Sequence, residues 1–158
     1  MKKNLLVSSA LLCAATLMGS QSAVAGENWV GSWKLNASKS KFASEAVTRA
    51  DTLKFESTTA GIKLTSQGTD PQGKAVHGEY TSHFDGKDVP WTGNPSADVA
   101  CPKRIDDNSY ENVWKKGGKA TITAKATVSK DGKTLTISQK GTDAQGATVS
   151  SVAVYDRQ

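Results

Sequence analysis

From Gly31 onward the chain alternates apolar and polar residues in short runs, which Gly, Asp, Asn or Pro interrupts at regular intervals. A period of two residues is typical of strands with one buried face. No sustained helical period appears after Gly26. The pattern therefore predicts ten β-strands, at residues 31–35, 51–57, 61–67, 75–84, 88–92, 97–105, 109–115, 119–129, 133–140 and 147–156.

The turns between these runs have a chemistry of their own. Asp85-Gly86, Gly117-Gly118 and Asp131-Gly132 are dipeptides that tolerate the positive φ of two-residue hairpins. We therefore expect consecutive strands to be antiparallel neighbours. The six-residue turn that begins at Gly68 returns almost unchanged at Gly141, which is compatible with an old duplication or with one hairpin geometry used twice.

Residues 36–50 separate the first two predicted strands and are rich in Ser and Ala. We predict a loop here with at most one or two helical turns. It is either a plain surface connection or a lid over one end of the molecule.

Alternate residues of the predicted strands collect on a single apolar face. The residues expected on it are Trp33, Leu35, Leu53, Phe55, Ile62, Leu64, Val76, Tyr80, Phe84, Val99, Cys101, Tyr110, Trp114, Ile122, Ala124, Ala126, Val128, Leu135 and Ile137. An antiparallel meander with one apolar face must close on itself or pack on a second sheet. Closure into a barrel removes the exposed edges. We predict an all-β fold, an antiparallel up-and-down β-barrel of about 8–10 strands.

The number of strands bears on function. About eight strands enclose an interior that side chains fill or that holds one small ligand, and further strands widen it. The inward residues of the later strands include the small Ala124, Ala126 and Ser151. These residues fit a lumen that holds a ligand, and they fit a thin, filled core equally well.

The first residues predict export. Met1-Lys2-Lys3 is basic, residues 5–18 are largely apolar, and Ala23-Val24-Ala25 resembles a signal-peptidase site. We expect residues 1–25 to be a secretory signal peptide and residues 26–158 a single barrel domain that is periplasmic or secreted. The apolar run is shorter than the roughly 20 residues of a membrane-spanning helix, so we expect no integral membrane segment. Leu12 before Cys13 argues against lipid attachment.

The charge and the cysteine content argue against a nucleic-acid partner and against an internal disulfide. Without Lys2 and Lys3 the chain keeps 18 of its 20 basic residues against 15 acidic ones, a net +3 with neutral histidines. The lysines are scattered, so we expect no nucleic-acid partner, and we expect a monomer. Cys101 is then the one remaining cysteine, which rules out an internal disulfide. We predict a buried, unreactive thiol rather than a nucleophile.

Little in the sequence indicates an enzyme, a metal site or a cofactor. His77 and His83 lie on one predicted strand, with Cα atoms roughly 20 Å apart. His77 and Glu79 share its polar face but supply two ligands where zinc needs three or four. The aspartates fall in turns that select them for local hydrogen bonds. No nucleophile has a nearby base, and no phosphate-binding loop occurs. We expect no catalytic residue, no metal ligand and no cofactor.

One stretch resembles a known family. Trp29-Val30-Gly31-Ser32-Trp33-Lys34-Leu35 resembles the opening strand of the calycins, the lipocalins and fatty-acid-binding proteins, which share a Gly-x-Trp there. The chain is also similar to exported bacterial proteins of unassigned role that are described as lipocalin-like. The resemblance implies a calycin-like barrel in which Trp33 plugs one end and a small apolar molecule binds inside.

The chain departs from the fatty-acid-binding proteins at two places. Residues 36–50 are too few for the two helices found there in that family. The Arg-x-Tyr pair that holds the ligand carboxylate is replaced by Ala153-Val154-Tyr155. The Tyr is present and the Arg is missing.

These features lead to a prediction for the ligand. We expect the cations Arg49, Arg104 and Lys125 to lie outside the barrel, and a buried carboxylate without a cation is costly. The ligand should then be neutral and mostly apolar, with one hydroxyl or carbonyl. The alternative is a non-enzymatic structural or protein-interaction module of the cell envelope with a filled core. The predicted ligand-binding residues are Phe55, Tyr80, Trp91, Tyr110, Trp114 and Tyr155.

Overall fold

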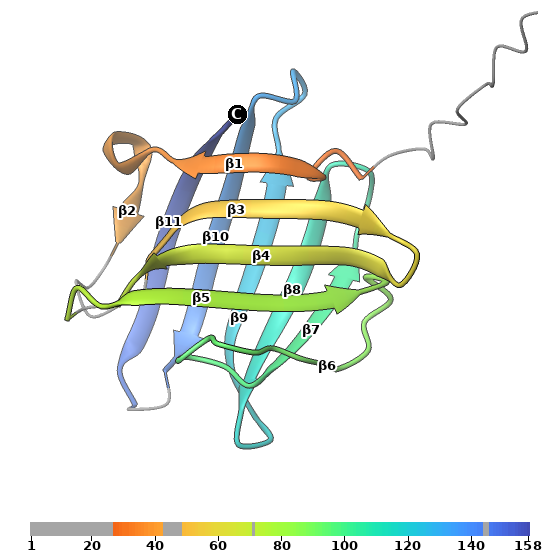
Figure 1. Ribbon diagram of the computed structural model, residues 1–158. Coiled ribbons are helices and arrows are strands. Elements are labelled where there is room, and N and C mark those ends of the chain that lie inside the picture. The colour runs from red at the N-terminus through yellow and green to blue at the C-terminus, as the bar shows by residue number, and fades with distance from the viewer. Residues whose placement is uncertain (1–26, 43–48, 71, 144–145) are drawn as a thin grey trace, which may run out of the picture.

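Figure 1 shows the computed structural model of the protein, which describes residues 27–42, 49–70, 72–143 and 146–158. Within these residues, eleven strands form one antiparallel sheet. The strands are β1 (Gly31–Leu35), β2 (Lys41–Phe42), β3 (Arg49–Thr58), β4 (Gly61–Thr69), β5 (Ala75–Ser82), β6 (Val89–Pro90), β7 (Val99–Arg104), β8 (Ser109–Lys116), β9 (Lys119–Val128), β10 (Thr134–Thr142) and β11 (Thr148–Arg157). A 3₁₀ turn, η1 (Ala37–Lys39), follows β1.

The strand order makes this sheet a nearly closed barrel. It runs β5-β4-β3-β1-β11-β10-β9-β8-β7-β6, while β2 pairs with β11 off this path. Because β1 pairs with both β3 and β11, the last strand of the meander joins the first. At the two ends of the order, Glu79 of β5 bridges to Thr92, two residues after β6, through backbone hydrogen bonds of 2.9 and 3.0 Å. The predicted all-β up-and-down barrel is confirmed.

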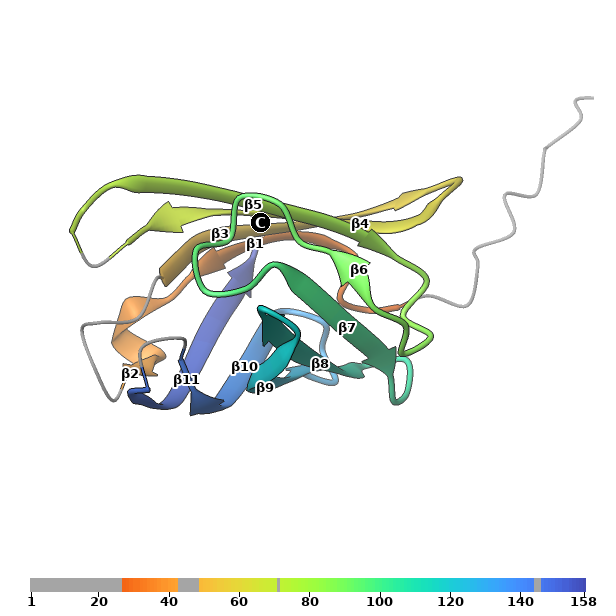
Figure 2. The same cartoon turned by 90° about the horizontal axis from the view of Figure 1, so that it is seen from below.

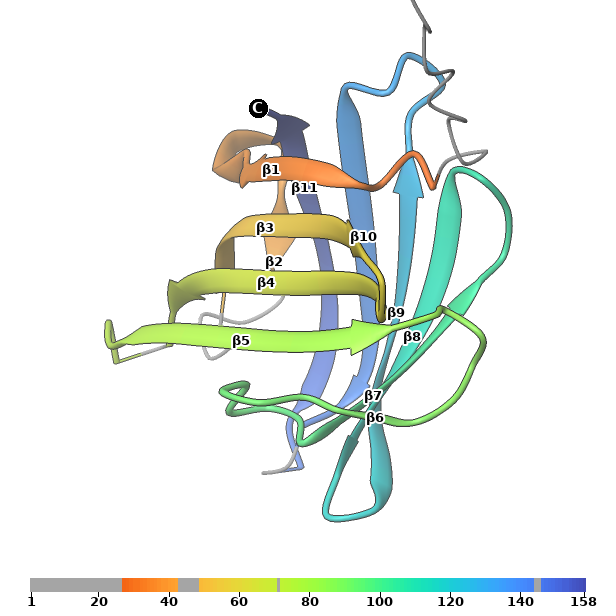
Figure 3. The same cartoon turned by 45° about the vertical axis from the view of Figure 1, so that its right-hand side comes forward.

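The barrel is flattened into two layers. In Figure 1, β1, β3, β4 and β5 cross in front of β7–β11 at a steep angle, and Figure 2 shows the same layers one above the other. Figure 3 shows β1 meeting β11 at one edge, where the sheet turns from one layer into the other. The inward faces of both layers therefore look at each other across the core.

The turns differ in part from the prediction. Gly117 and Gly118 form the expected two-residue hairpin between Lys116 and Lys119, with φ of 55° and 78°. Asp131-Gly132 lies instead in a five-residue connection, residues 129–133. The expected hairpin at Asp85-Gly86 is wrong, because Asp85 bridges to Lys103 of β7. Residues 83–88 thus form a longer connection from β5 to β6 that runs along β7 instead of a tight hairpin.

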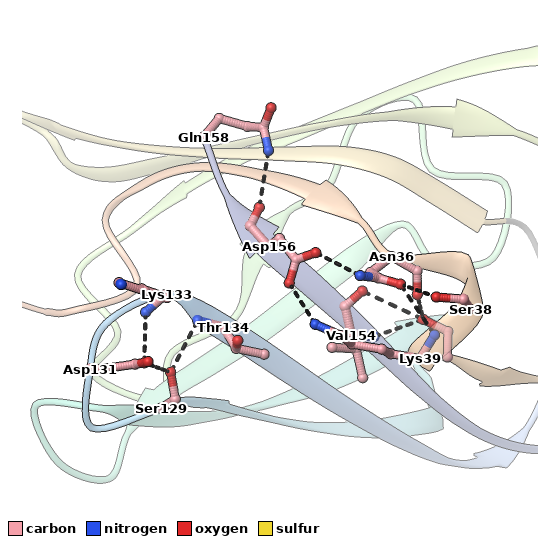
Figure 4. Close-up of polar contacts among 11 residues, drawn as sticks. Asn36, Ser38, Lys39, Ser129, Asp131, Lys133, Thr134, Val154, Asp156 and Gln158 are labelled. Carbon is pink, nitrogen blue, oxygen red and sulfur yellow. Dashed lines mark hydrogen bonds and ion pairs between the residues drawn. The ribbon is translucent and has the colours of Figure 1, made fainter.

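The connection after β1 is fastened onto the last strand. Asn36 caps η1 through its side-chain oxygen, and its amide donates to Asp156 Oδ2 at 2.6 Å (Figure 4). Lys39 reaches the same carboxylate at 3.5 Å. The predicted loop therefore contains one helical turn and the short β2. Residues 43–48, on which the lid interpretation depends, lie outside the described residues.

A second group in Figure 4 stabilises the β9–β10 connection. Ser129 Oγ donates to Asp131 Oδ1 at 2.5 Å, and Asp131 also accepts from the backbone of Lys133 at 3.1 Å. These bonds lower the pKa of Asp131. Asp131 is therefore a turn residue, as its place in the sequence predicted.

Trp33 closes one end of the barrel, as predicted. It is 1% exposed, and its indole N–H donates to the carbonyl of Trp29 at 2.7 Å. The guanidinium of Arg157 on β11 lies 4.2 Å from the ring centroid of Trp33 and donates to Val30 O at 3.0 Å. Gly31, with φ of 135°, makes room for this contact, because a Cβ there would lie 2.5 Å from Arg157 Nη1. The glycine of the Gly-x-Trp motif thus leaves room for the guanidinium of Arg157, which packs on the tryptophan. Sequence reasoning missed this contact.

The predicted inward face is correct on most strands and wrong on β7. Ala100 and Pro102 are the buried residues of this strand, while Val99 and Cys101 are half-buried on its other face. The rings of Trp91 and Trp114, carried on either side of β7, meet on the inward side, and the residue paired with Trp114 there is Ala100.

The predicted signal segment, residues 1–25, lies outside the described residues. In the ranges that the structure describes, no helix is long and apolar enough to cross a membrane.

Candidate ligand-binding cavity

A cavity of about 550 Å³ lies between the two layers of the barrel. This volume is within the roughly 300–1,000 Å³ typical of small-molecule sites. Its wall is mostly apolar and aromatic. The inward residues of the strands that line it include Leu53, Leu64, Val76, Tyr80, Tyr110, Trp114, Ile122, Ala124, Ile137, Val149, Ala153 and Tyr155.

The cavity extends toward the end of the barrel opposite Trp33. The chain enters β11 next to the cavity, at Ala147 and Val149, and β11 ends beside Trp33 at Arg157. Turns and strand ends supply the rest of this rim, which we call the mouth. The described residues of the mouth are Phe42, Arg49, Gly68, Asp70, Gln72, Gly93, Asn94, Pro95, Ser96, Asp143 and Ala147.

Five of the six predicted ligand-binding residues line the cavity. These are Tyr80, Trp91, Tyr110, Trp114 and Tyr155. Phe55 does not line it. This residue is 1% exposed and packs on Tyr110, with ring centroids 5.9 Å apart, in the floor below the cavity. Alternation along β3 placed Phe55 on the inward face but carried no information on its depth.

The aromatic side chains form a continuous cluster of tilted and edge-to-face contacts from the floor to the cavity wall. Trp29 packs on Phe84 and Tyr110 in the floor, with ring centroids 5.7 and 5.3 Å away. Tyr80 then contacts Trp91 at 5.1 Å. Trp91 contacts Trp114 edge to face at 5.0 Å. These contacts hold the indoles of Trp91 and Trp114 in place, because aromatic rings in edge-to-face geometry stabilise one another.

A band of polar residues lies on the same wall, of which sequence reasoning had placed only Ser151 on the inward face. Ser66, Asn112 and Gln139 line the cavity, and Ser151 lies buried beside Gln139. Each continues the alternation of apolar inward residues: Ser66 follows Leu64, Asn112 lies between Tyr110 and Trp114, and Gln139 follows Ile137. The period of two thus contained the signal, but the prediction left out Ser66, Asn112 and Gln139 because they are polar.

Most acceptors of this polar band are already used. Asn112 Oδ1 accepts from the backbone of Cys101 at 3.0 Å. Gln139 Oε1 accepts from Ser151 Oγ at 3.0 Å. Ser66 Oγ donates to the carbonyl of Gly78 at 3.1 Å. Each of these side chains therefore already has a hydrogen-bond partner within the protein.

Two of the three tyrosine hydroxyls of the wall also have partners. Tyr155 donates to the carbonyl of Ala50 at 2.9 Å, and Tyr80 accepts a long bond from Asn112 Nδ2 at 3.4 Å. Burial raises the pKa of Tyr80, Tyr110 and Tyr155 well above the ordinary value. The three hydroxyls therefore stay protonated at every physiological pH.

Several buried donors in this region have no partner. Among the described residues, the buried side-chain nitrogens without a hydrogen bond are the Nε1 atoms of Trp29, Trp91 and Trp114 and the Nε of Arg49. Arg49, Trp91 and Trp114 line the cavity with other atoms, because these nitrogens are themselves buried. An unpaired buried donor costs roughly 1–3 kcal/mol.

The structure corrects one placement of charge. Arg49 was expected outside the barrel, but it lies half-buried at the mouth, 4.8 Å from the ring centroid of Phe42. Asp70 and Asp143 lie at the same mouth. Arg104 is outside as expected, in ion pairs with Glu27 and Asp107. The deeper wall carries no charged side chain among the described lining residues.

Histidines and the cysteine stand apart from the cavity. His77 and His83 are exposed, and His77 Nε2 lies 3.9 Å from Glu79. In the part of the chain that the structure describes, no three His, Cys, Asp or Glu residues group to hold a metal ion. Cys101 is half-buried rather than buried, with Sγ 3.0 Å from the carbonyl of Gly86. Burial and a hydrogen bond to Asp88 raise the pKa of its thiol.

The barrel agrees with the likeness that the first strand suggested. It is all-β, antiparallel and nearly closed, and Trp33 of the Gly-x-Trp motif lies buried at one end. These features are compatible with a calycin-like fold. Compared with known proteins, the chain matches no family model and no curated sequence.

Proposed function

We propose that this protein is an exported barrel that binds one neutral, mostly apolar small molecule in its central cavity. The observation that carries the proposal is the cavity of about 550 Å³, whose wall combines apolar and aromatic side chains with a few polar ones, Ser66, Asn112 and Gln139. Such a combination is typical of small-molecule sites.

Charge distribution supports a neutral ligand. The charged residues among the described lining, Arg49, Asp70 and Asp143, all lie at the mouth, where two carboxylates accompany one guanidinium. A carboxylate carried deeper would lose its hydration without gaining a cation, which costs several kcal/mol. A neutral molecule avoids this cost, so we propose binding without ionic anchoring.

Small inward residues support a ligand rather than a filled core. Ala124 on β9 and Ala153 on β11 line the cavity on either side of β10, where they pair with Gln139 and Ile137 respectively. Larger residues at these positions would fill the space. A structural module with no ligand would gain stability from such filling, because voids in a core are costly.

Mass spectrometry of the native protein tests the proposal. The protein is purified under gentle conditions from the envelope or medium of the producing cells. We expect one neutral, apolar molecule that is released when the protein unfolds. An organic extract of the cells should also raise the melting temperature of protein stripped of ligand, since a molecule that binds only the folded state stabilises it. A protein that carries nothing and melts unchanged in the extract contradicts the proposal.

A further inference from the structure

We infer that the hydroxyl of Tyr110, at the inner end of the cavity, forms the hydrogen bond that anchors the polar group of the ligand. This group is a neutral hydroxyl or carbonyl oxygen, and the ligand lies with its polar end inward and its apolar part toward the mouth. The inference rests on the proposed function and specifies which of the predicted ligand-binding residues contacts the polar group.

The Tyr110 hydroxyl is left without a partner inside the barrel. The residue is 4% exposed and lines the cavity. Tyr80 and Tyr155 each have a hydrogen-bond partner, whereas Tyr110 has none among the described residues. Unlike the indole nitrogens of Trp91 and Trp114, its oxygen is not enclosed by neighbouring atoms. Because Tyr110 lines the cavity, the open surface of this hydroxyl faces the space where a ligand would lie.

Aromatic packing holds the ring of Tyr110 in the floor. Its centroid lies 5.0 Å from that of Phe84, 5.3 Å from that of Trp29 and 5.9 Å from that of Phe55. None of these three residues lines the cavity. The ring is therefore fixed from below, and its hydroxyl stays at the inner end of the cavity.

Tyr80 and Asn112 add a second hydroxyl in the same part of the wall. Asn112 Oδ1 accepts from the backbone of Cys101 at 3.0 Å, and its amide nitrogen donates to the Tyr80 oxygen at 3.4 Å. This bond uses an acceptor site of Tyr80 and leaves its proton for another partner. Burial, and then the nearby hydroxyls of Tyr80 and Tyr155, raise the pKa of Tyr110. The Tyr110 hydroxyl therefore stays protonated and can donate to a neutral oxygen.

The strand register indicates the orientation of the ligand. Trp114 pairs with Ile122, which pairs with Gly141. Gly141 pairs with Val149, where the chain enters β11 beside the mouth. The Trp114 end of β8 therefore lies toward the mouth, and Tyr110 lies toward the floor.

An apolar row thus lies on the mouth side of Tyr110. It consists of Trp114, Ile122 and Val149, which all line the cavity. A ligand whose polar group lies at Tyr110 places its apolar part along this row. In the opposite orientation an apolar end would cover the Tyr110 hydroxyl and leave it unpaired, which is costly.

The experiment compares the binding of two ligands to delipidated parent protein and to Tyr110→Phe. The ligands are a straight-chain methyl ketone and the alkane of equal length, and each is measured by displacement of the neutral fluorescent dye N-phenyl-1-naphthylamine. Phe keeps the ring in the floor and removes the hydroxyl alone. We expect the ketone to bind ~10-fold more weakly to the variant, the effect of one lost hydrogen bond, and the alkane to bind both proteins equally.

Tyr155→Phe is the matched comparison. It also removes a hydroxyl from the cavity wall, but one that already donates to the carbonyl of Ala50 at 2.9 Å. The ketone should therefore lose less affinity in this variant than in Tyr110→Phe. A larger loss in Tyr155→Phe would assign the polar group to Tyr155 and overturn the inference.

Moving the carbonyl along the chain tests the orientation. The isomeric ketone with its carbonyl at mid-chain should bind the parent protein more weakly than the methyl ketone does. The two isomers should bind Tyr110→Phe with similar affinity. Equal binding of both isomers to the parent protein would overturn an orientation with the polar end inward.

Infrared spectroscopy gives a measurement that needs no variant. A hydrogen bond lowers the stretching frequency of a carbonyl, so the band of an isotope-labelled methyl ketone should lie lower in the parent protein than in hexane. It should return toward the hexane position in Tyr110→Phe. A band at the hexane position in the parent protein would overturn the inference even if the variant failed to fold.

The remaining outcomes separate the inference from the proposed function. Unchanged ketone affinity in Tyr110→Phe, or its loss in Gln139→Met instead, overturns the inference, while dye binding leaves the proposed function standing. Tighter binding of the corresponding carboxylate, lost in Arg49→Gln, also overturns it and assigns the polar group to Arg49. Failure of the dye and of every ligand to bind contradicts the proposed function itself.

Discussion

The rings of Trp91 and Trp114 meet edge to face, with centroids 5.0 Å apart, on the inward side of β7. Ala100, the residue of β7 paired with Trp114, is fully buried there. Ala100 therefore lies on the same side of β7 as the two indoles, where a larger side chain would take up space beside them.

Ala100→Leu should destabilise the protein by about 1–3 kcal/mol, because added methylenes in a packed wall force neighbours out of place. Val99→Leu is the matched control on the other, half-buried face of β7 and should change the free energy of unfolding by less than about 0.5 kcal/mol. Urea unfolding of both variants measures the difference. Equal effects of the two substitutions would instead support the prediction from sequence, in which Val99 lies on the inward face of β7.

Trp33→Ala should cost about 3–5 kcal/mol of folding free energy. The substitution empties the closed end and removes both the hydrogen bond to Trp29 O and the contact with Arg157. Thermal and urea unfolding measure the loss. A variant that melts within a degree or two of the parent would show that the likeness of the first strand to the calycins is coincidental.

Stability should fall at alkaline pH because of the buried tyrosines. Burial raises the pKa of Tyr80 above its unfolded value of about 10. The unfolded chain then loses its protons first as the pH rises. The tyrosine contribution is therefore fully present below about pH 10 and is lost progressively above it. Tyr80→Phe should flatten this decline in urea unfolding between about pH 9 and 11. If the stability of parent and variant falls equally steeply with pH, the Tyr80 hydroxyl is exposed to water in the folded protein.

Cys101 should react slowly with thiol reagents at pH 8. Burial and the neighbouring Asp88 raise the pKa of the thiol, which lowers the fraction of reactive thiolate. Asp88→Asn removes the negative charge, so we expect faster labelling at the same pH, with Asp85→Asn as a weaker control. Rapid labelling of the parent protein, or no change in Asp88→Asn, would contradict this account of the site.

The alternation of residues predicted which side chains point inward better than how deep they lie. On β9, the inward Ile122, Ala124, Ala126 and Val128 are all buried as predicted. Phe55 also points inward, but it belongs to the floor, because the depth of a residue depends on where its strand crosses the other layer. A period of two contains no information on that crossing.

The candidate site could be predicted in part for the same reason. Tyr110 and Trp114 were found because aromatic residues on an inward face stand out, whereas Asn112 between them was left out as polar. Arg49 lies next to a connection whose path the pattern does not determine. Arg157 contacts Trp33 only because β11 returns to β1, a pairing between residues far apart in the chain.

Titration of delipidated protein with the neutral dye N-phenyl-1-naphthylamine tests the central claim most directly when two Ala→Phe variants of β9 are compared. Ala124 lines the cavity, whereas Ala120 on the same strand is exposed. We predict that the parent protein and Ala120→Phe bind one dye molecule with equal affinity, and that Ala124→Phe, folded and melting cooperatively, binds it ~10-fold more weakly because the new ring occupies the cavity. Equal binding by all three proteins, or no binding by the parent, would contradict a ligand site inside the barrel.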